Sequence, residues 1–167
     1  MYAMKYDMKT NIKPNIKYIL LFIFTTLADR ISKAIIEANF FEGEIRPLIN
    51  NILYAVYSKN QGAAYGIGSN AGWLINIIAV ILIIVMLFVF MKYKSVILRT
   101  GVIFVISGGA NNIYDRIFNN GVTDFIYIKP LAFVFANFNF ADIFITAGVI
   151  LMGVYILFFD KKVTAQD

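Results

Sequence analysis

Runs of apolar residues alternate with short polar segments along the chain, and this pattern predicts four membrane-spanning helices. A helix of roughly 20 apolar residues crosses the hydrocarbon core of a bilayer. The segments 73–91 and 143–159 contain nineteen and seventeen residues without a charge. The segment 97–113 is mainly apolar, and its glycines would allow a neighbouring helix to approach closely. These three segments are therefore expected to span the membrane.

The first span is expected over about 15–36. It reaches the required length if Lys17 lies at one membrane interface and Asp29 and Lys33 lie at the other. A secretory signal peptide with a cleavage site at Thr26-Leu27-Ala28 is an alternative interpretation of the same stretch. We expect the segment to be retained as a span.

Two longer segments, about 37–70 and 114–141, connect the spans. They fall on the same side of the membrane, because an even number of spans separates them. Residues 52–57 alternate between side chains that favour strands, and glycines follow them. The expected fold is thus a mainly α integral membrane protein, a single membrane domain over 1–167, with four transmembrane helices and a small periplasmic β-sheet segment between helices 1 and 2.

Composition and charge support this fold and give it an orientation. Hydrophobic residues make up 60% of the chain and charged residues 15%, against about 45–50% and about 25% in soluble domains. The two termini and the loop 92–99 carry nine basic and three acidic residues, whereas the remainder carries six and seven. The positive-inside rule therefore places both termini in the cytoplasm and the long segments outside. The net charge of +5 is thus explained by topology, and no nucleic-acid partner is expected.

The sequence has no cysteine and no histidine. This excludes disulfides, thiol nucleophiles, catalytic triads with an imidazole base, and histidine-ligated metal sites. An enzyme of this composition has to move protons with Asp, Glu, Lys or Tyr. We expect neither a metal nor a cofactor.

Ionisable side chains at membrane depth are costly and indicate function by default. Asp29 and Lys33 are four residues apart and share one helix face, and an interfacial ion pair that anchors the first span is the simpler explanation. Asn60 begins a polar turn that continues into Gly62 and further small residues. This turn is either a loop that ends a strand or a backbone held close to a ligand, with Asn60 offering its amide.

A second polar group, Asn112, Asp115 and Arg116, ends the third span. Asn112 lies on the same helix face as the other two, at spacings of three and four residues. One interpretation is helix packing through the preceding glycines together with an Asp–Arg ion pair. The other is that Asn112 and Arg116 donate hydrogen bonds to the backbone of a substrate.

Two aspartates in the outer segments could form an acid pair. Asp124 lies among apolar residues that disfavour its charged form, although an exposed loop position would also explain it. Asp142 follows Asn139 by three residues, and a helix-capping box would account for both without chemistry. If the chain between them folds back, the two carboxyls share a proton, so that one serves as base for water and the other as acid.

Taken together, these motifs resemble those of the bacterial lipoprotein signal peptidases (signal peptidase II). Five family patterns occur in order and cover nearly the whole chain. They are Asp29-Arg30-Ile31-Ser32-Lys33 for D-x-x-S-K, Asn60-Gln61-Gly62-Ala63-Ala64-Tyr65 for N-x-G-A-A-F, Asn111-Asn112-Ile113-Tyr114-Asp115-Arg116 for G-N-x-I-D-R, Val122-Thr123-Asp124-Phe125 for V-x-D-F, and Phe138-Asn139-Phe140-Ala141-Asp142 for F-N-x-A-D. Each is weak alone, and the ordered set is specific.

The resemblance implies a membrane-embedded aspartic endopeptidase with Asp124 and Asp142 as its catalytic pair. It implies a diacylglyceryl-modified prolipoprotein as substrate, cut just before the lipidated cysteine, and inhibition by globomycin-type compounds. It also implies a multi-pass protein of the bacterial inner membrane that has membrane lipid as a partner and is expected to be a monomer. The residues that would shape or support the site are Asp29, Lys33, Asn60, Gly62, Asn112, Asp115, Arg116, Asn139 and Ala141.

Three other classes of protein fit the sequence less well. A proton channel or transporter needs a polar path across the bilayer, but the span 73–91 offers only Asn76. A membrane assembly factor without catalysis would tolerate loss of either aspartate. A serine–lysine peptidase is poorly supported, because Ser32-Lys33 are adjacent and neighbouring helical residues point apart.

Overall fold

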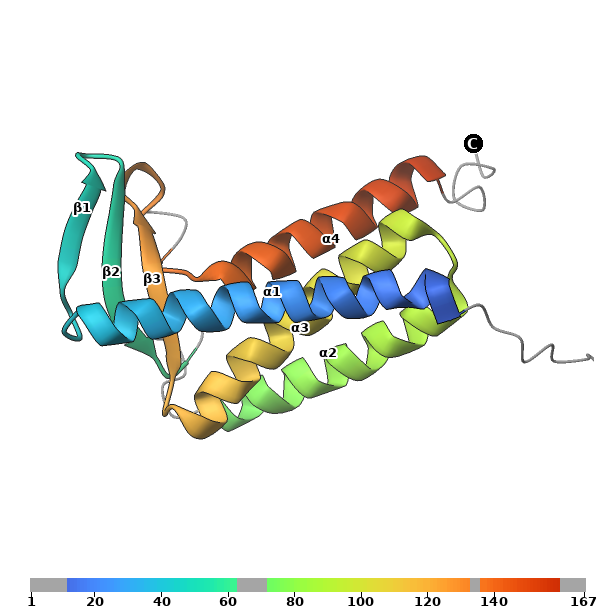
Figure 1. Cartoon of the computed structure of the whole chain (residues 1–167), viewed down its shortest axis with the longest axis horizontal. Coiled ribbons are helices and arrows are strands. Elements are labelled where there is room, and N and C mark those ends of the chain that lie inside the picture. Colours follow the sequence, from blue (N-terminus) through green and yellow to red (C-terminus); the bar gives the residue numbers. More distant parts are fainter. Residues whose placement is uncertain (1–11, 63–71, 133–135, 160–167) are drawn as a thin grey trace, which may run out of the picture.

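The computed structural model describes residues 12–62, 72–132 and 136–159 of the chain. Helices form a bundle, and a small sheet covers one end of it (Figure 1). The elements, in chain order, are α1 (Ile12–Asn39), β1 (Ile45–Ile49), β2 (Leu53–Asn60), α2 (Gly72–Lys92), α3 (Val96–Phe118), β3 (Val122–Ile128), the short 3-10 turn η3 (Lys129–Leu131) and α4 (Phe140–Phe159).

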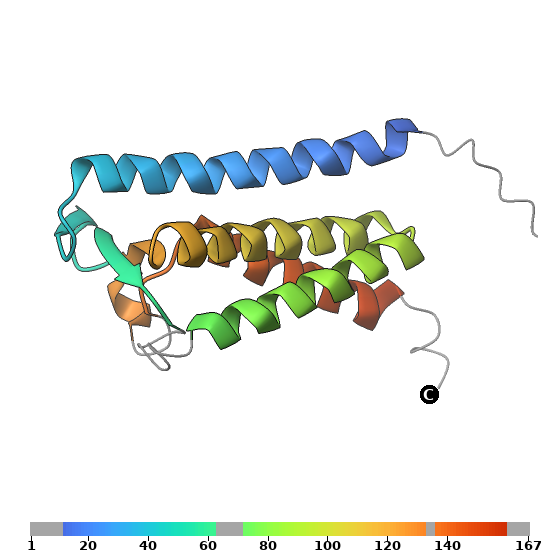
Figure 2. The ribbon, with the colours of Figure 1, turned by 90° about the horizontal axis from the view of Figure 1, so that it is seen from below.

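The helix α3 is the centre of the bundle. It packs against α1, α2 and α4, and it lies between α1 and α2 (Figure 2). Within the described residues, three helices are long and apolar enough to cross a membrane: Trp73–Lys92 in α2, Val96–Phe118 in α3 and Phe140–Phe159 in α4. These three agree with the expected spans, whereas the 28-residue α1 carries several charges and is not among them.

Helix α3 continues beyond residue 113, where the apolar segment ends, as far as Phe118. Its end is set by Asn119, whose backbone N–H donates to the carbonyl of Asp115. Asn120 and Gly121 then adopt positive φ angles of 55° and 143°, which turn the chain back toward the sheet. Gly121 suits this turn because its φ is one that side chains rarely adopt. The polar residues at the end of α3 are therefore helical, and a short turn connects them to strand β3.

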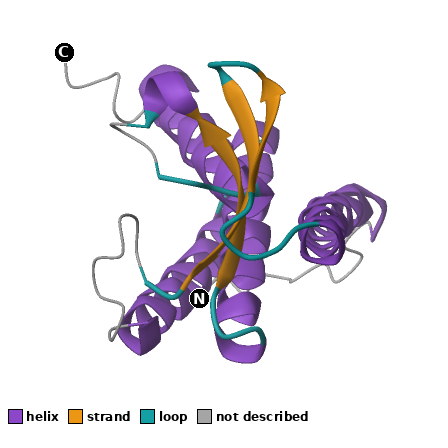
Figure 3. Ribbon diagram, turned by 90° about the vertical axis from the view of Figure 1, so that its left-hand side faces the viewer, coloured by secondary structure: helices purple, strands orange, loops and turns teal. Residues whose placement is uncertain are grey.

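The sheet is antiparallel, with strand order β1-β2-β3 (Figure 3). Strand β2 confirms the strand expected over 52–57. The expectation that the sheet lies between the first two helices is wrong in part, because β3 comes from the segment between α3 and α4. Asp124, expected in a loop, lies in this strand. Valine, threonine and aromatic neighbours favour the pleated backbone, and β3 pairs with β2, more than sixty residues earlier.

The buried apolar core lies between α3, α4 and the sheet. Val102 and Ala141 are fully buried, and Val56 and Val122 are almost so. By contrast, α2 and α4 expose most of their apolar side chains, as Phe88 at 64% illustrates. Such exposure is costly in water but suits a surface that faces lipid.

Small residues allow α3 and α4 to touch along their backbones. A Cβ atom added at Gly108 would lie 2.4 Å from the carbonyl oxygen of Ala141, and one at Gly148 would lie 2.5 Å from that of Gly101. Close backbone approach of this kind is a common mode of helix packing in membranes. The contact at Gly108 sets the position of Ala141, and hence of the first turn of α4, which carries Asp142.

We predict that Gly108→Ala destabilises the protein by about 1–3 kcal/mol, the usual cost of overpacking. The added methyl group meets the Ala141 backbone, which cannot move aside as a flexible side chain would. Gly153→Ala is the matched control, because a Cβ there meets nothing within 4 Å. Thermal unfolding of both variants in detergent micelles tests the prediction, and equal unfolding temperatures would contradict it.

Candidate active site

The structure brings Asp124 and Asp142 to the same residue, Asn139. The side-chain Nδ2 of Asn139 donates to Asp124 Oδ1 over 2.7 Å. The backbone N–H of Asn139 donates to Asp142 Oδ2 over 3.2 Å. One asparagine therefore connects a carboxylate on β3 with a carboxylate on the first turn of α4, and we call the two aspartates the acid pair.

Asn139 reaches both acids because the chain before α4 is paired with β3. The backbone of Phe138 accepts from the N–H of Ile126 over 2.8 Å and donates to its carbonyl over 3.0 Å. The Asp142 N–H also donates to Asn139 Oδ1 over 3.1 Å, which completes the expected capping box. The capping interpretation is thus correct but incomplete, since the same side chain extends to Asp124.

Asp124 is 3% exposed, and a second amide holds its other oxygen. Asn60, at the end of β2, donates from Nδ2 to Asp124 Oδ2 over 3.0 Å. Burial and, second to it, the negative charge of Asp142 together raise the pKa of Asp124 to about 7, despite the lowering effect of the bonds from Asn60 and Asn139. This carboxyl group therefore binds a proton far more tightly than an exposed aspartate does.

Asp142 is connected in turn to α3 and α1. Asn112 Nδ2 donates to Asp142 Oδ1 over 2.8 Å, and Asn112 Oδ1 accepts from Lys33 Nζ over 3.2 Å. The lysine ammonium group can only donate hydrogen bonds, so it binds the oxygen of the Asn112 amide and leaves the NH2 group to face the carboxylate. Two side chains in series, Lys33 of α1 and Asn112 of α3, thus orient Asp142.

Lys33 is the centre of a buried ion cluster. Its Nζ lies 2.7 Å from Asp29 Oδ2 and 2.7 Å from Asp115 Oδ2, and Arg30 also bonds Asp115. Asp29 and Asp115 are fully buried. The Asp29–Lys33 pair therefore exists as expected, but it lies inside the bundle, facing α3, and not at an exposed interface.

Asp29 also supports the start of α4. Its Oδ1 accepts the backbone N–H of Ala141 over 2.9 Å. The first N–H groups of a helix lack partners within the helix, and a carboxylate there is favoured by the helix dipole. Ala141 contributes through its backbone, and its small side chain permits the contact with Gly108.

Arg116 does not form the ion pair with Asp115 that packing alone suggested. Its Nη2 donates to the carbonyl of Gly62 over 3.3 Å, and the Gly62 N–H donates to Asn60 Oδ1 over 3.1 Å. The turn at Asn60 and Gly62 is thus tied to both α3 and the acid pair. The small residues expected next to it, Ala63 to Gly66, lie outside the described residues.

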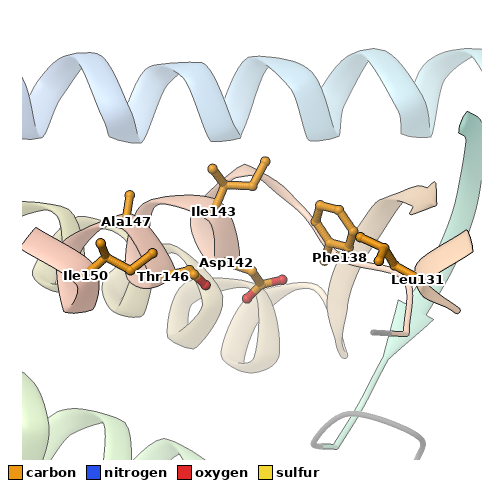
Figure 4. Close-up of a pocket in the computed structure, with 7 residues that line it drawn as sticks. All are labelled: Leu131, Phe138, Asp142, Ile143, Thr146, Ala147 and Ile150. Carbon is orange, nitrogen blue, oxygen red and sulfur yellow. The ribbon is translucent and has the colours of Figure 1, made fainter. Parts of the chain in front are cut away.

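A pocket of about 360 Å³ opens beside Asp142 (Figure 4). Apart from this aspartate and a threonine, its walls are apolar. They are formed by Leu131, Phe138, Ile143, Thr146, Ala147 and Ile150. An apolar wall next to a carboxylate suits a ligand that combines hydrocarbon with a polar group.

Sequence reasoning missed the part played by Arg30. It lies between the two selected residues of the first motif, and its guanidinium stacks 4.8 Å from the ring of Tyr114 while bonding Asp115. A charge placed one residue after Asp29, within an expected span, was the available signal. Among the described residues, no three carboxylates, cysteines or histidines are grouped to hold a metal ion.

The fold and the site together define a helical membrane protein with two hydrogen-bonded carboxyl groups, one buried and one partly buried, at one end of its bundle. Comparison with known proteins agrees with this class. The family described as signal peptidase (SPase) II matches residues 21–158. A lipoprotein signal peptidase from Clostridium novyi (strain NT) is 34% identical over 142 residues, which are 83% of this chain and 96% of that protein. One from Clostridioides difficile (strain 630) is 33% identical over 147 residues, 87% and 97% of the two chains.

Solved structures give the same result. Two bacterial membrane enzyme structures, both obtained by the in meso method, superpose with TM-scores of 0.79 and 0.77 at 29% identity. They cover 84% and 87% of this chain, and 87% and 94% of their own. The chain belongs to the signal peptidase II family and is accordingly a protease of the membrane, which confirms the resemblance found in its motifs.

We predict that Lys33→Met destabilises the protein by about 3–5 kcal/mol, as expected when one partner of a buried ion pair is removed. The variant keeps the apolar stem but leaves Asp29 and Asp115 without their shared ammonium group. Chemical unfolding in detergent micelles measures the change. Lys129→Met is the control, because Lys129 is exposed and a surface change costs within about 0.5 kcal/mol. Equal stability of the two variants would show that the cluster contributes little.

Proposed function

We propose that this protein is an aspartic endopeptidase that removes the signal peptide from diacylglyceryl-modified prolipoproteins by cutting just before the lipidated cysteine. The observation that carries the proposal is the connection of Asp124 and Asp142 through Asn139. Family membership supports a protease, and a sequence without histidine or cysteine leaves carboxyl groups as its proton carriers. The lipid modification and the cleavage position are expectations from the family.

The acid pair has the properties needed to activate water. Two neighbouring carboxyls do not both ionise readily, so the pair retains one proton. The ionised member accepts a proton from water, and the resulting hydroxide attacks the scissile carbonyl carbon. The protonated member donates to the carbonyl oxygen. As the C–N bond of the tetrahedral intermediate breaks, the first carboxyl passes the proton that it took from water to the leaving amine, and the second carboxyl recovers its proton from a hydroxyl group of the intermediate.

The other residues proposed for the site act on this pair or on the chain bound to it. The side chains of Asn60, Asn112 and Asn139 fix the orientation of the two carboxyls. The backbone N–H of Asn139 contributes by donating to Asp142. Gly62 and Arg116 hold the turn beside the pair. The residues proposed to stabilise this arrangement through the contacts of α1 with α3 and α4 are Asp29, Lys33, Asp115 and Ala141.

We propose that α1 is the fourth membrane span. Its charged residues Asp29 and Lys33 are buried against α3, whereas apolar side chains such as Leu20 and Phe24 are exposed. A helix with an apolar outer surface and ionic groups turned inward satisfies the conditions for crossing a bilayer. With four spans, the positive-inside rule places both termini in the cytoplasm and the acid pair at the outer face of the inner membrane.

The pocket beside Asp142 suits a substrate that is itself anchored in the membrane. It follows α4 from Asp142 past Thr146 to Ile150, along the direction in which this helix enters the bilayer. A lipid-modified prolipoprotein combines a hydrophobic helix, acyl chains and a peptide bond, and it reaches such a pocket by lateral diffusion. Globomycin-type inhibitors and a monomeric state remain expectations from the family.

We predict that Asp124→Asn and Asp142→Asn each lower cleavage by at least about 10³-fold, within the range that acid–base groups contribute. An amide can neither take the proton from water nor return it. Vesicles containing the full-length protein and a diacylated prolipoprotein provide the assay, with the product detected by its mass shift. Glu42→Gln, an exposed carboxyl group away from the site, is the control and retains activity. Cleavage at the control rate by either aspartate variant would remove the proposal.

We predict that kcat/KM falls about tenfold per pH unit above about pH 7, because one proton must stay on the pair. Burial raises the pKa of Asp124 to about 7, so the required proton is bound below this pH and lost above it. The sign is the reverse of that for an enzyme whose base must become deprotonated at the same pH. Initial rates between pH 5 and pH 9 measure the profile, and a rate that still rises at pH 9 would contradict it.

A further inference from the structure

A polar cluster outside the acid pair joins three elements of the structure. Lys59 Nζ lies 2.8 Å from Glu37 Oε1 and 2.8 Å from Thr123 Oγ1. The Thr123 hydroxyl in turn donates to Glu37 Oε1. Glu37 comes from the end of α1, Lys59 from β2 and Thr123 from β3. We call these three residues the strand anchor.

Thr123, the member of the strand anchor on β3, directly precedes Asp124 in the sequence. Successive side chains of a strand point to opposite faces. Thr123 is fully buried and bonds Glu37 of α1, whereas Asp124 bonds Asn139 at the start of α4. The strand β3 is therefore fixed from both faces at adjacent positions, toward α1 by the threonine and toward α4 by the aspartate.

The pairing of β2 with β3 is irregular at this position. Ala55 pairs with Ile126 and Ser58 with Asp124, so the register shifts between them. Beyond the shift, Lys59 and Thr123 are direct partners in the ladder. A shift of one residue in a strand moves its side chains to the other face. Regular pairing alone does not fix the direction of Asp124, and the bond from Lys59 to Thr123 supplies a side-chain constraint at the neighbouring pair.

We propose that Glu37 and Lys59 are positioning residues that act through Thr123 to hold the Asp124 carboxyl in its reactive orientation. The proposal rests on the proposed function of Asp124. Within the part of the chain that the structure describes, neither side chain bonds either member of the acid pair, and the side chains of Glu37 and Lys59 are 35% and 18% exposed. Ion pairs that are partly exposed contribute little to stability. Their loss should therefore appear in catalysis more than in unfolding.

The test uses Lys59→Met and Thr123→Val in the full-length protein, reconstituted in phospholipid vesicles with a diacylated prolipoprotein. Misplacement of a reacting group by 1 Å can cost about 100-fold in rate. We expect kcat per folded molecule to fall by about tenfold or more, with KM within about twofold, because substrate contacts are kept. The limb of the pH profile near pH 7 is also expected to move. Lys59→Arg keeps donors for both partners and is expected to recover most of kcat.

Arg46→Met is the matched control. Arg46 forms an ion pair with Glu44 over 2.7 Å in the same sheet, but on β1 and away from Thr123. We expect this variant to keep the kcat and pH profile of the natural sequence. An equal loss in this control, or losses that only follow the folded fraction, would overturn the proposal.

If Thr123→Val does not fold, Lys59→Met decides, since the lysine is partly exposed. The two levels of the argument fail differently. Cleavage by Asp124→Asn at the control rate would remove the proposed function itself. An inactive Asp124→Asn together with Lys59→Met at the unaltered kcat and pH profile would remove only the positioning role.

Discussion

The requirement that buried carboxyl groups have hydrogen-bond partners organises the end of the bundle that the sheet covers. Asp29, Asp115 and Asp124 are buried and Asp142 is partly buried, and a buried carboxyl group without hydrogen-bond partners is costly. Their donors come from several parts of the chain. Lys33 on α1 bonds Asp29 and Asp115, Asn112 on α3 bonds Asp142, and Asp124 is bonded by Asn60 at the end of β2 and by Asn139 just before α4. The helices and strands are held together at this end by the same bonds that set the acids in place.

Close packing makes those bonds geometrically attainable. Asn112 reaches Asp142 because α3 and α4 touch at Gly108, one turn before the asparagine. The Ala141 N–H reaches Asp29 because the start of α4 also faces α1. On the opposite, outward faces of the helices, exposed apolar side chains suit contact with lipid. The hydrogen bonds between the helices thus depend on the close backbone contacts that glycine permits.

Local patterns in the sequence predicted much of this arrangement. The apolar runs located α2, α3 and α4, the alternation at 52–57 located β2, and the spacing of Asn139 and Asp142 indicated the capping box. What the sequence did not show depends on contacts between distant residues. Strand β3 was hidden because its aspartate suggested a loop, and its partner strand lies more than sixty residues away. The third partner of Lys33, Asp115, is likewise brought close only by the packing of α1 against α3.

The double role of Asn139 limits how this sequence can change during evolution. Serine or threonine at this position would still begin α4, but neither has the side-chain amide that donates to Asp124. Aspartate would also begin the helix, yet it has no N–H to donate to Asp124 and would add a negative charge beside the acid pair. Glutamine would reach farther while losing the short geometry of the cap. One side chain therefore serves both the start of a membrane helix and the proposed chemistry, and a substitution that keeps the first role loses the second.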